Sequence, residues 1–200
     1  STDKSVQGIT LEEVIAGHGV VPLRNQSEIA RSYSNQTYKT TSGKIDLYYE
    51  NLVSYGQALP QYEAPNEAFE GNPLAEKYPL NMTQRRSKYF IHQNYYDATW
   101  IRQFYEPTLE MNPIDAKERS IESGDMIEAF NDRGSFKCKC VTTQAVRPGT
   151  CVIVEGIWPK YMEQGSMQNV TNDAVNPRGA VLAKGRVIPF NDTLVDVKKA

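Results

Sequence analysis

The sequence has no run of about 18 apolar residues, the length that a membrane-spanning helix needs, so we expect no direct insertion into a membrane. Its formal net charge of -2 lacks the basic excess of nucleic-acid-binding proteins, so we expect no nucleic-acid partner. The chain begins at Ser1 without an initiating Met and without the apolar stretch of a signal peptide. We therefore expect a processed or excised chain, with room in 200 residues for one domain and an extension or for two small domains.

Cysteine and histidine are too few and too scattered for a disulfide framework or a metal centre. Three cysteines occur, and an odd number cannot form a closed set of disulfides. Cys138 and Cys140 are two residues apart, which places both on one face of a strand, and we expect them to be small core side chains. The histidines, His18 and His92, have no ligand spacing to the cysteines, so the sequence predicts no metal site.

Residues 1–76 are polar and weakly patterned, and we interpret them as the tail of a preceding domain followed by an extended linker. Thr10 and Glu13 have the spacing of a capping box, which predicts a short helix at that point. Ile45–Tyr49 alternates like a strand. Residues 56–76 contain several Gly and Pro with little apolar periodicity, which is typical of a linker.

Residues 77–200 are predicted to form the compact domain, because short apolar segments alternate there with Gly and Pro turns. Asp132–Gly134 predicts a first hairpin turn and Arg147–Gly149 a second. Many short strands and few helices favour a mainly β fold built as a small barrel. The expected strands lie at 78–83, 108–112, 125–130, 135–142, 150–155 and near 184–189, and the expected helical segments at 95–104 and 113–119.

The segment 83–94 is dense in hydrogen-bond donors and falls between an expected strand and an expected helix. Strand ends and helix starts present free backbone N–H groups, which suit anions. A large polar ligand with a pyrophosphate and a heterocycle would find cations, amides and hydroxyls here. On composition alone, a solvated polar loop explains the same residues, and that alternative stays open.

Six short motifs form an ordered set along the chain. They are Thr41–Tyr48 (TSGKIDLY), Tyr78–Arg85 (YPLNMTQR) with Ile91–Asn94 (IHQN), Asn112–Ala116 (NPIDA) with Ile121–Ile127 (IESGDMI), Asn131–Gly134 (NDRG), Val146–Gly149 (VRPG) and Gln168–Thr171 (QNVT). Each motif is weak alone, but their order resembles the C-terminal molybdopterin-dinucleotide-binding domain of the dimethyl sulfoxide reductase family of molybdenum oxidoreductases. The resemblance covers roughly residues 40–190.

This resemblance implies a six-stranded double-psi β-barrel with short helices that binds molybdopterin guanine dinucleotide. In that family the metal ligand and the iron–sulfur cysteines belong to earlier domains, so we expect this chain to be inactive alone and to lack the cofactor when isolated. Such cofactors carry the redox chemistry, while the protein binds and orients them. The expected partners are the remaining domains of a parent catalytic subunit, of the anaerobic dehydrogenase or sulfoxide reductase type, and an iron–sulfur electron-transfer subunit.

The resemblance also implies which residues face the dinucleotide. We expect Arg85 on a phosphate, His92 beside the pterin and Asp115 on the guanine, whose N–H groups can donate to a carboxylate. Asn112 and Asp115 fit equally well as the N-cap and first turn of a helix, and Asn169 fits as a turn residue. We expect the set to meet on one rim of the barrel, and it comprises Thr83, Arg85, His92, Gln93, Asn94, Asn112, Asp115 and Asn169.

Tyr96, Trp100 and Phe104 have near-helical spacing, and we interpret them as a packing stripe rather than as the wall of a nucleotide site. Trp158 is also interpreted as a packing residue. Two other functions stay open: a separate small protein that binds the same dinucleotide and assembles with a catalytic chain, and a double-psi barrel that serves as a protein-interaction module without a cofactor. The donor-rich segment 83–94 disfavours the interaction module.

Overall fold

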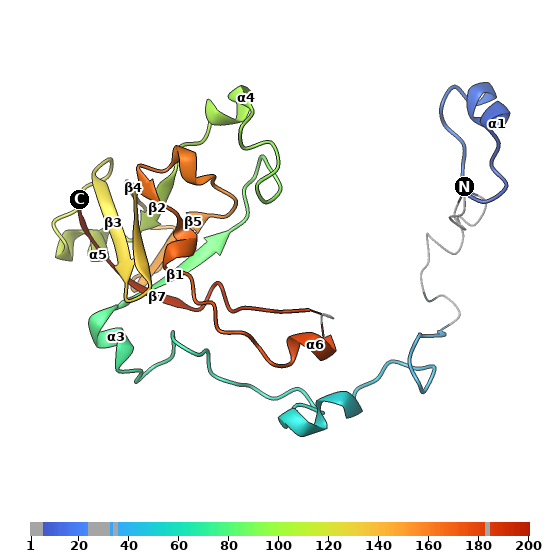
Figure 1. The fold of residues 1–200 in the computed structure, drawn as a ribbon, viewed down its shortest axis with the longest axis horizontal. Helices are drawn as coiled ribbons and strands as arrows, with labels where there is room; N and C mark the ends of the chain where they lie inside the picture. The colour runs from blue at the N-terminus through green and yellow to red at the C-terminus, as the bar shows by residue number, and fades with distance from the viewer. Residues whose placement is uncertain (1–5, 24–32, 34–35, 183–184) are drawn as a thin grey trace. The chain divides into compact units, whose positions relative to one another are not determined.

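The computed structural model of the chain describes residues 6–23, 33, 36–182 and 185–200, in an N-terminal unit, Ser1–Pro60, and a larger unit, Gln61–Ala200 (Figure 1). The division predicted at residue 76 stays a prediction. In the N-terminal unit, α1 (Leu11–Ala16) begins at a capping box, in which Thr10 Oγ1 accepts from the Glu13 backbone at 3.2 Å and Glu13 Oε2 accepts from the Thr10 backbone at 2.9 Å. The short helix predicted there is confirmed.

The strand predicted at Ile45–Tyr49 is wrong. Those residues form bends and open loop, and the 3₁₀ helix η1 (Glu50–Tyr55) follows them. The described residues of this unit contain no strand that could pair with such a segment. An isolated strand would leave its backbone N–H and C=O groups without partners, so the alternation of side chains is not enough to form one.

The larger unit is built on a closed barrel of six strands. Among the described residues the sheet order is β2-β5-β1-β7-β3-β4, and β4 pairs with β2 to close the ring, while β6 lies outside the ring on β4. The strands are β1 (Leu80–Arg85), β2 (Thr108–Met111), β3 (Met126–Asn131), β4 (Gly134–Thr142), β5 (Thr150–Val154), β6 (Gln164–Gly165) and β7 (Thr193–Lys199). The predicted mainly β barrel is confirmed, and its two parallel pairs, β1 with β5 and β2 with β4, are consistent with a double-psi barrel.

Short helices connect the strands. They are α3 (Leu74–Lys77), α4 (Thr99–Arg102), α5 (Pro113–Glu118), η2 (Pro159–Tyr161), η3 (Met167–Asn169) and α6 (Gly179–Leu182). Figure 1 shows the connections around the strands of this unit, with α5 close to the C-terminal strand. No helix of the described residues has both the length and the apolar composition to cross a lipid bilayer.

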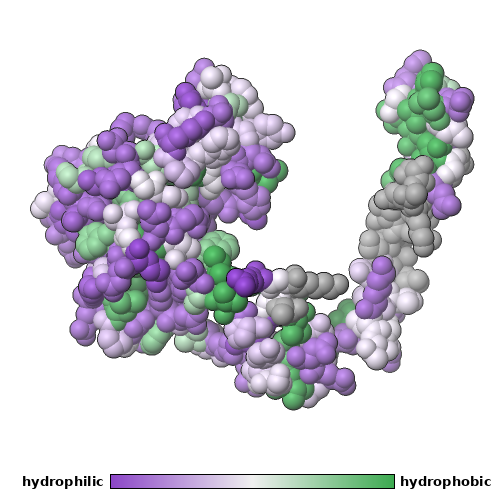
Figure 2. Space-filling model, in the orientation of Figure 1, coloured by the Kyte–Doolittle hydropathy of each residue, from purple (hydrophilic) through white to green (hydrophobic). Residues whose placement is uncertain are grey.

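The barrel interior is apolar because alternate residues of each strand point inward. Leu80 and Met82 of β1 are fully buried, as is Phe136 of β4. Cys138 and Cys140 are buried on the same face of β4, and Cys151 is buried on β5. The three cysteines are free thiols in the core, and the core position predicted for Cys138 and Cys140 is confirmed. The face of this unit that Figure 2 shows is mostly hydrophilic, with scattered hydrophobic patches.

The strand expected near 184–189 is wrong, and the last strand of the barrel lies further along the chain. Of the described part of that segment, Val187 forms only an isolated bridge with Asn176. Instead β7 pairs with both β1 and β3 and so closes the barrel between them. Its buried Leu194, Val195 and Val197 give it a core-facing side that the 184–189 segment does not have.

Two local predictions also need correction. Arg147–Gly149 forms a turn, with Thr150 N donating to Arg147 O at 3.2 Å, but it makes no hairpin because β4 and β5 are not neighbours in the described sheet. The helix expected over 95–104 is reduced to the single turn of α4, because Tyr95 is left-handed and Ala98, with ψ of 131°, is extended, so the helix begins only at Thr99. Tyr96 is buried, but Trp100 and Phe104 are exposed, so the predicted packing stripe is wrong for those two.

Candidate functional site

The strand registers determine which segments share an end of the barrel. β1 and β5 run parallel, so that Arg85 lies opposite Val154 and the segments after both strands emerge together. β2 runs antiparallel to β5, with Met111 opposite Cys151, so the segment after β2 emerges beside the start of β5. We call the first of these the Arg85 end, formed by residues 85–94 and 155–158, and the second the Asn112 end, formed by residues 112–116 and 146–149.

The Asn112 end is built around buried polar side chains that bond within the chain. Asn112 Oδ1 accepts from Ile114 N at 2.9 Å and caps α5, while its Nδ2 donates to Val146 O at 2.7 Å. Asp115 Oδ2 accepts from Gly149 N at 2.9 Å. Both side chains are buried. The structural role that the sequence allowed for Asn112, as the N-cap of a helix, is therefore confirmed.

At the Arg85 end, β1 presents two of the predicted residues. Thr83 is half-buried within β1. Arg85, at its last position, forms an ion pair with Glu110 of β2. The guanidinium of Arg85 is therefore partly neutralised within the barrel wall. The next residue, Arg86, is 71% exposed, and its nearest carboxylate, Glu155, is 3.9 Å away.

The loop after β1 packs against the residues after β5. Gly156 has φ of +83°, and a Cβ added there would lie 1.9 Å from the carbonyl oxygen of His92. Trp158 Nε1 donates to Gln93 O at 3.1 Å. His92 itself has a left-handed φ of 52°, which is uncommon for a residue other than glycine. The His92–Gln93 peptide is therefore held against the end of β5, and Asn94 follows in an exposed turn.

Glu155 is the least satisfied group at this end. Its side chain is 16% exposed, and its Oε1 is buried and accepts no hydrogen bond from any described residue. His92 Nδ1 lies 3.3 Å from that oxygen, which is within ion-pair distance but not aligned as a hydrogen bond. A buried carboxylate oxygen without a donor costs free energy, so its retention calls for an explanation.

A groove of about 620 Å³ adjoins this loop, and Gln93, Gly156, Trp158, Met167 and Gln168 line it. It combines an indole, a buried thioether and two amide side chains. The segment that carries Gln168 lies beside β1, because Gln84 Nε2 of β1 donates to Thr171 Oγ1 at 3.2 Å. Asn169, on the same segment, is exposed, and its Nδ2 donates to Ser135 O at 3.2 Å.

The structure thus divides the predicted site residues between two ends. The Arg85 end contains, or lies next to, Thr83, Arg85, His92, Gln93, Asn94 and Asn169. Asn112 and Asp115 lie at the opposite end, so the expectation that all eight meet on one rim is wrong. The reason is the strand direction, since β2 runs against β5 and delivers Asn112 to the start of that strand.

Sequence reasoning missed Glu155 altogether. Its interpretation of Trp158 as a packing residue is confirmed, since Trp158 packs against the core, but it did not predict that Trp158 also lines the groove. The signal available was the sequence Glu155-Gly156-Ile157-Trp158 directly after a strand, where a glycine permits close approach of another backbone. Within the described residues, no three His, Cys, Asp or Glu side chains gather as a metal-binding group.

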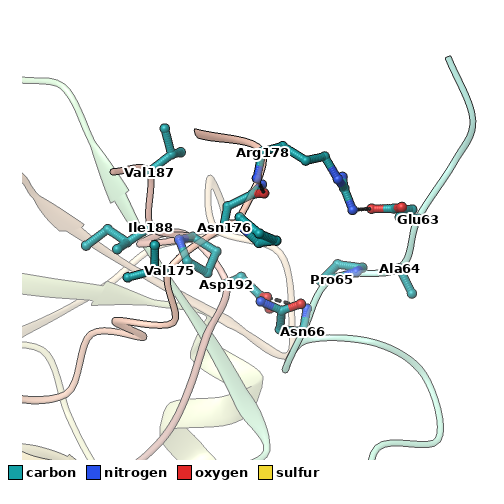
Figure 3. A pocket seen from close by; sticks show the side chains of 12 residues that line it. Glu63, Ala64, Pro65, Asn66, Val175, Asn176, Arg178, Val187, Ile188 and Asp192 are labelled. Carbon is teal, nitrogen blue, oxygen red and sulfur yellow. Dashed lines mark hydrogen bonds and ion pairs between the residues drawn. The ribbon is translucent and has the colours of Figure 1, made fainter. Parts of the chain in front are cut away.

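A second hollow of about 450 Å³ lies between residues 63–66 and the loop that contains Asn176 and Arg178 (Figure 3). Asp192 accepts there from Asn66 N at 2.5 Å and from Ala68 N at 2.7 Å, and Arg178 pairs with Glu63. These contacts fasten the 63–68 segment to the barrel, although Arg178 Nε is buried and has no hydrogen-bond partner among the described residues. None of the predicted site residues lines this hollow.

Comparison with known families decides the identity of the fold. The sequence profile of the family described as "Molydopterin dinucleotide binding domain" matches residues 80–184, more than half of the chain. The chain belongs to this family. Its relatives place it with the dimethyl sulfoxide reductase type, which confirms the resemblance seen in the sequence.

Three relatives illustrate the similarity. Dimethyl sulfoxide reductase DmsA of Haemophilus influenzae is 32% identical over 177 residues, which is 80% of this chain and 21% of the relative. Dimethyl sulfoxide reductase DmsA of Escherichia coli is 30% identical over 175 residues, which is again 80% of this chain and 21% of the relative. A dimethyl sulfoxide/trimethylamine N-oxide reductase of Cereibacter sphaeroides is 35% identical over 60% of this chain and 15% of the relative. The chain spans about a fifth of the length of either DmsA protein.

Among solved structures, acetylene hydratase from Pelobacter acetylenicus is similar, with a TM-score of 0.63 and 23% identity. The similarity covers 85% of this chain and 25% of that one. At this identity the likeness supports the fold alone, and it agrees with the barrel described above.

Proposed function

We propose that the Arg85 end of this barrel binds molybdopterin guanine dinucleotide, and that the chain is the cofactor-binding domain of an oxidoreductase. The observation that carries the proposal is the buried Glu155 Oε1, which has no hydrogen bond from a described residue and lies beside two exposed donors, His92 and Arg86. Native proteins rarely leave such an oxygen unpaired unless the site has a further purpose. The family supports a dinucleotide as that purpose.

The residues at this end fit the chemistry of such a ligand. Arg86 and Arg85 offer guanidinium groups for a pyrophosphate, with Arg86 the freer of the two because Arg85 pairs with Glu110. Thr83 and the amides of Gln93, Asn94 and Asn169 offer donors and acceptors for the edges of a heterocycle. His92 would bond near the pterin. When bound, the cofactor supplies the dithiolene sulfurs that carry the metal and its redox chemistry.

Asn112 and Asp115 form a second proposed contact group, in which the Asp115 carboxylate would accept hydrogen bonds from the N–H groups of the guanine. Both side chains bond within the chain at one or more atoms, so this part of the proposal has less support than the Arg85 end. A ligand that contacts both groups would have to extend along the barrel, because the two groups lie at opposite ends.

The rest of the proposed enzyme lies outside this chain. The two DmsA relatives are about four times as long as this chain, and we propose that corresponding domains supply the metal ligand and the electron-transfer clusters. In this view residues 1–76 are the tail of a preceding domain and a linker, the parent enzyme is a sulfoxide reductase or anaerobic dehydrogenase, and an iron–sulfur protein is its partner. As purified, the isolated chain would carry no bound dinucleotide, because a single domain buries only part of the ligand and binds it weakly.

The test is a binding titration. The chain is titrated anaerobically with molybdopterin guanine dinucleotide released from a loaded molybdoenzyme, and binding is followed by calorimetry. We expect saturable binding that excess GDP weakens more than ADP does. Competition by ADP as strong as that by GDP would contradict the guanine assignment, and the absence of binding to a folded chain would contradict the proposed function.

A further inference from the structure

Glu155 has no role in the proposed contacts, yet it lies directly behind one of them. We infer that Glu155 is a positioning residue, whose carboxylate, 3.3 Å from His92 Nδ1, favours the proton on that nitrogen and so leaves His92 Nε2 as the acceptor available to the cofactor. The functional part of this inference rests on the proposed function. The tautomer that it assigns to His92 is a property of the chain by itself.

The backbone of Glu155 is fixed by the barrel. Glu155 N donates to Arg85 O at 2.9 Å, which extends the β1–β5 ladder one residue beyond β5. The carboxylate is therefore attached to a rigid element. Its buried Oε1 has no hydrogen bond from a described residue, and His92 Nδ1 lies 3.3 Å from it, closer than Arg86 Nη1 at 3.9 Å.

Donor and acceptor chemistry then determines the proton on His92. An ionised carboxylate can only accept, so Nδ1 must be the donor toward Glu155. On the other side of the ring, Arg86 Nη1 lies 3.5 Å from His92 Nε2, and a guanidinium can only donate, so it too favours Nε2 as the acceptor. In the proposed function Arg86 binds the pyrophosphate, which leaves the lone pair of Nε2 to the heterocycle. A neutral imidazole carries one donor and one acceptor, and both neighbours select the same tautomer, with the proton on Nδ1.

The local backbone holds the imidazole in this place. The left-handed His92 and the close approach of its carbonyl to Gly156 fix the peptide over the end of β5, and the Trp158 indole bonds the next carbonyl. The His92 side chain is 58% exposed. An imidazole held in this way presents a lone pair, which suits the N–H-bearing edge of a pterin or guanine, whereas the other tautomer would present an N–H to the same edge.

The decisive experiment is ¹⁵N–¹H correlation spectroscopy of the imidazoles in the labelled chain, at a pH where they are neutral. The chain has two histidines, so His18 serves as an internal reference. We expect the Nδ1–H form of His92 to exceed the Nε2–H form by about tenfold or more, because the carboxylate of Glu155 and the guanidinium of Arg86 both favour it. A predominant Nε2–H form in the wild-type chain would overturn the inference without any variant.

Substitutions of Glu155 test whether the tautomer ratio of His92 depends on the carboxylate. Glu155→Ala removes the acceptor, and the preference for Nδ1–H should disappear, while Glu155→Gln keeps an uncharged acceptor and should give an intermediate ratio. Glu163→Ala, a change at an exposed glutamate, is the matched control and should leave the ratio as in the wild type. An unchanged ratio in a folded Glu155→Ala chain would also overturn the inference.

A second arm separates this inference from the proposed function. Pterin-6-carboxylate is added as a soluble pterin, and the His92 Nε2 resonance is followed in the wild type and in Glu155→Ala. We expect a shift in the wild type that is at least several-fold smaller in the variant. If the tautomer is as inferred but the pterin shifts nothing, the proposed function fails at this site while the role of Glu155 in orienting His92 stands.

Discussion

The two ends of the barrel differ in how their candidate site residues are bonded. Asn81 Oδ1, in β1 opposite the start of β5, is also buried without a hydrogen bond from the described residues, so the contrast is between Asn112 and Asp115 on one side and Glu155 on the other. At the Asn112 end, the amide of Asn112 is buried and bonded at both its oxygen and its nitrogen, and Asp115 bonds the turn that precedes β5. At the Arg85 end, Arg86 and His92 are exposed, and Glu155 Oε1 is buried without a hydrogen bond from the described residues. The first arrangement stabilises the fold, and the second leaves donors and an acceptor free for a ligand.

The two ends also differ in backbone strain. His92 adopts a left-handed φ and is pressed against Gly156, so the Arg85 end carries conformational strain at a residue that bears a functional group. At the Asn112 end, Gly149 also has a positive φ, but a Cβ there would meet no described heavy atom within 4 Å. Strain next to an unsatisfied polar group distinguishes a candidate binding site from a well-bonded structural feature.

The largest expected effect on stability is at the Asn112 end. Asn112→Ala removes the cap of α5 and the bond to Val146 O, and we expect the free energy of unfolding to fall by about 2–3 kcal/mol. Urea unfolding measures this change. Asn94→Ala, at an exposed turn of the other end, is the control and should change it by less than about 0.5 kcal/mol. Equal stability of the two variants would remove the contrast between the ends.

Gly156→Ala is expected to cost about 1–3 kcal/mol, because alanine disfavours φ of +83° and its Cβ would collide with His92 O. The backbone amides of the loop 86–98 should also exchange faster with solvent in this variant, because the loop has to move away from β5. Gly149→Ala, with φ of +77° and no described atom within 4 Å, is the matched control, and it should cost less and leave exchange in the loop unchanged. If both variants loosen the loop equally, Gly156 has no special contact there.

The buried cysteines of the barrel interior predict that the stability of the fold falls at alkaline pH. The two ends of the barrel do not contribute to this effect. Burial raises the pKa of the Cys138 thiol to about 12 and that of Cys140 to about 11, and it raises the pKa of Cys151 as well. The unfolded chain therefore loses these protons first, so stability is full below the ordinary thiol pKa of 9.0 and falls as pH rises above it. Between about pH 8 and pH 10, Cys151→Ala should reduce this loss by about 1 kcal/mol. An unchanged slope in thermal unfolding would show that Cys151 does not contribute.

The smallest expected effect on stability is at Arg86. Because its side chain is 71% exposed and its nearest carboxylate is 3.9 Å away, Arg86→Ala should change the free energy of unfolding by less than about 0.5 kcal/mol. Binding of the dinucleotide should nevertheless weaken about tenfold or more, through the loss of a charge-assisted hydrogen bond. Calorimetry of the same preparation checks both values. A variant that binds like the wild type would exclude Arg86 from the phosphate site.

Patterns within a few residues predicted much of this structure correctly. The capping box at Thr10, the hairpin turn at Asp132–Gly134 and five of the barrel strands depend on local sequence, and they appear within two residues of the predicted positions. The errors arise where pairing over long distances decides the outcome. β7 becomes a strand because β1 and β3 lie on either side of it, and Asn112 lies away from Arg85 because β2 runs against β5.

The candidate site was predictable in part for the same reason. The donor-rich segment 83–94 is visible in the sequence, and it lies at the Arg85 end. Glu155 is separated from His92 by more than 60 residues, and only the parallel pairing of β1 with β5 brings them together. A single sequence gives no indication of that pairing.

Chemical-shift mapping of the ¹⁵N-labelled chain with the two halves of the ligand, GDP and pterin-6-carboxylate, tests whether the Arg85 end faces the dinucleotide. We expect the amide shifts to concentrate in residues 84–94 and 155–158. Shifts confined to residues 112–116 and 146–149, with no response at the Arg85 end, would contradict it.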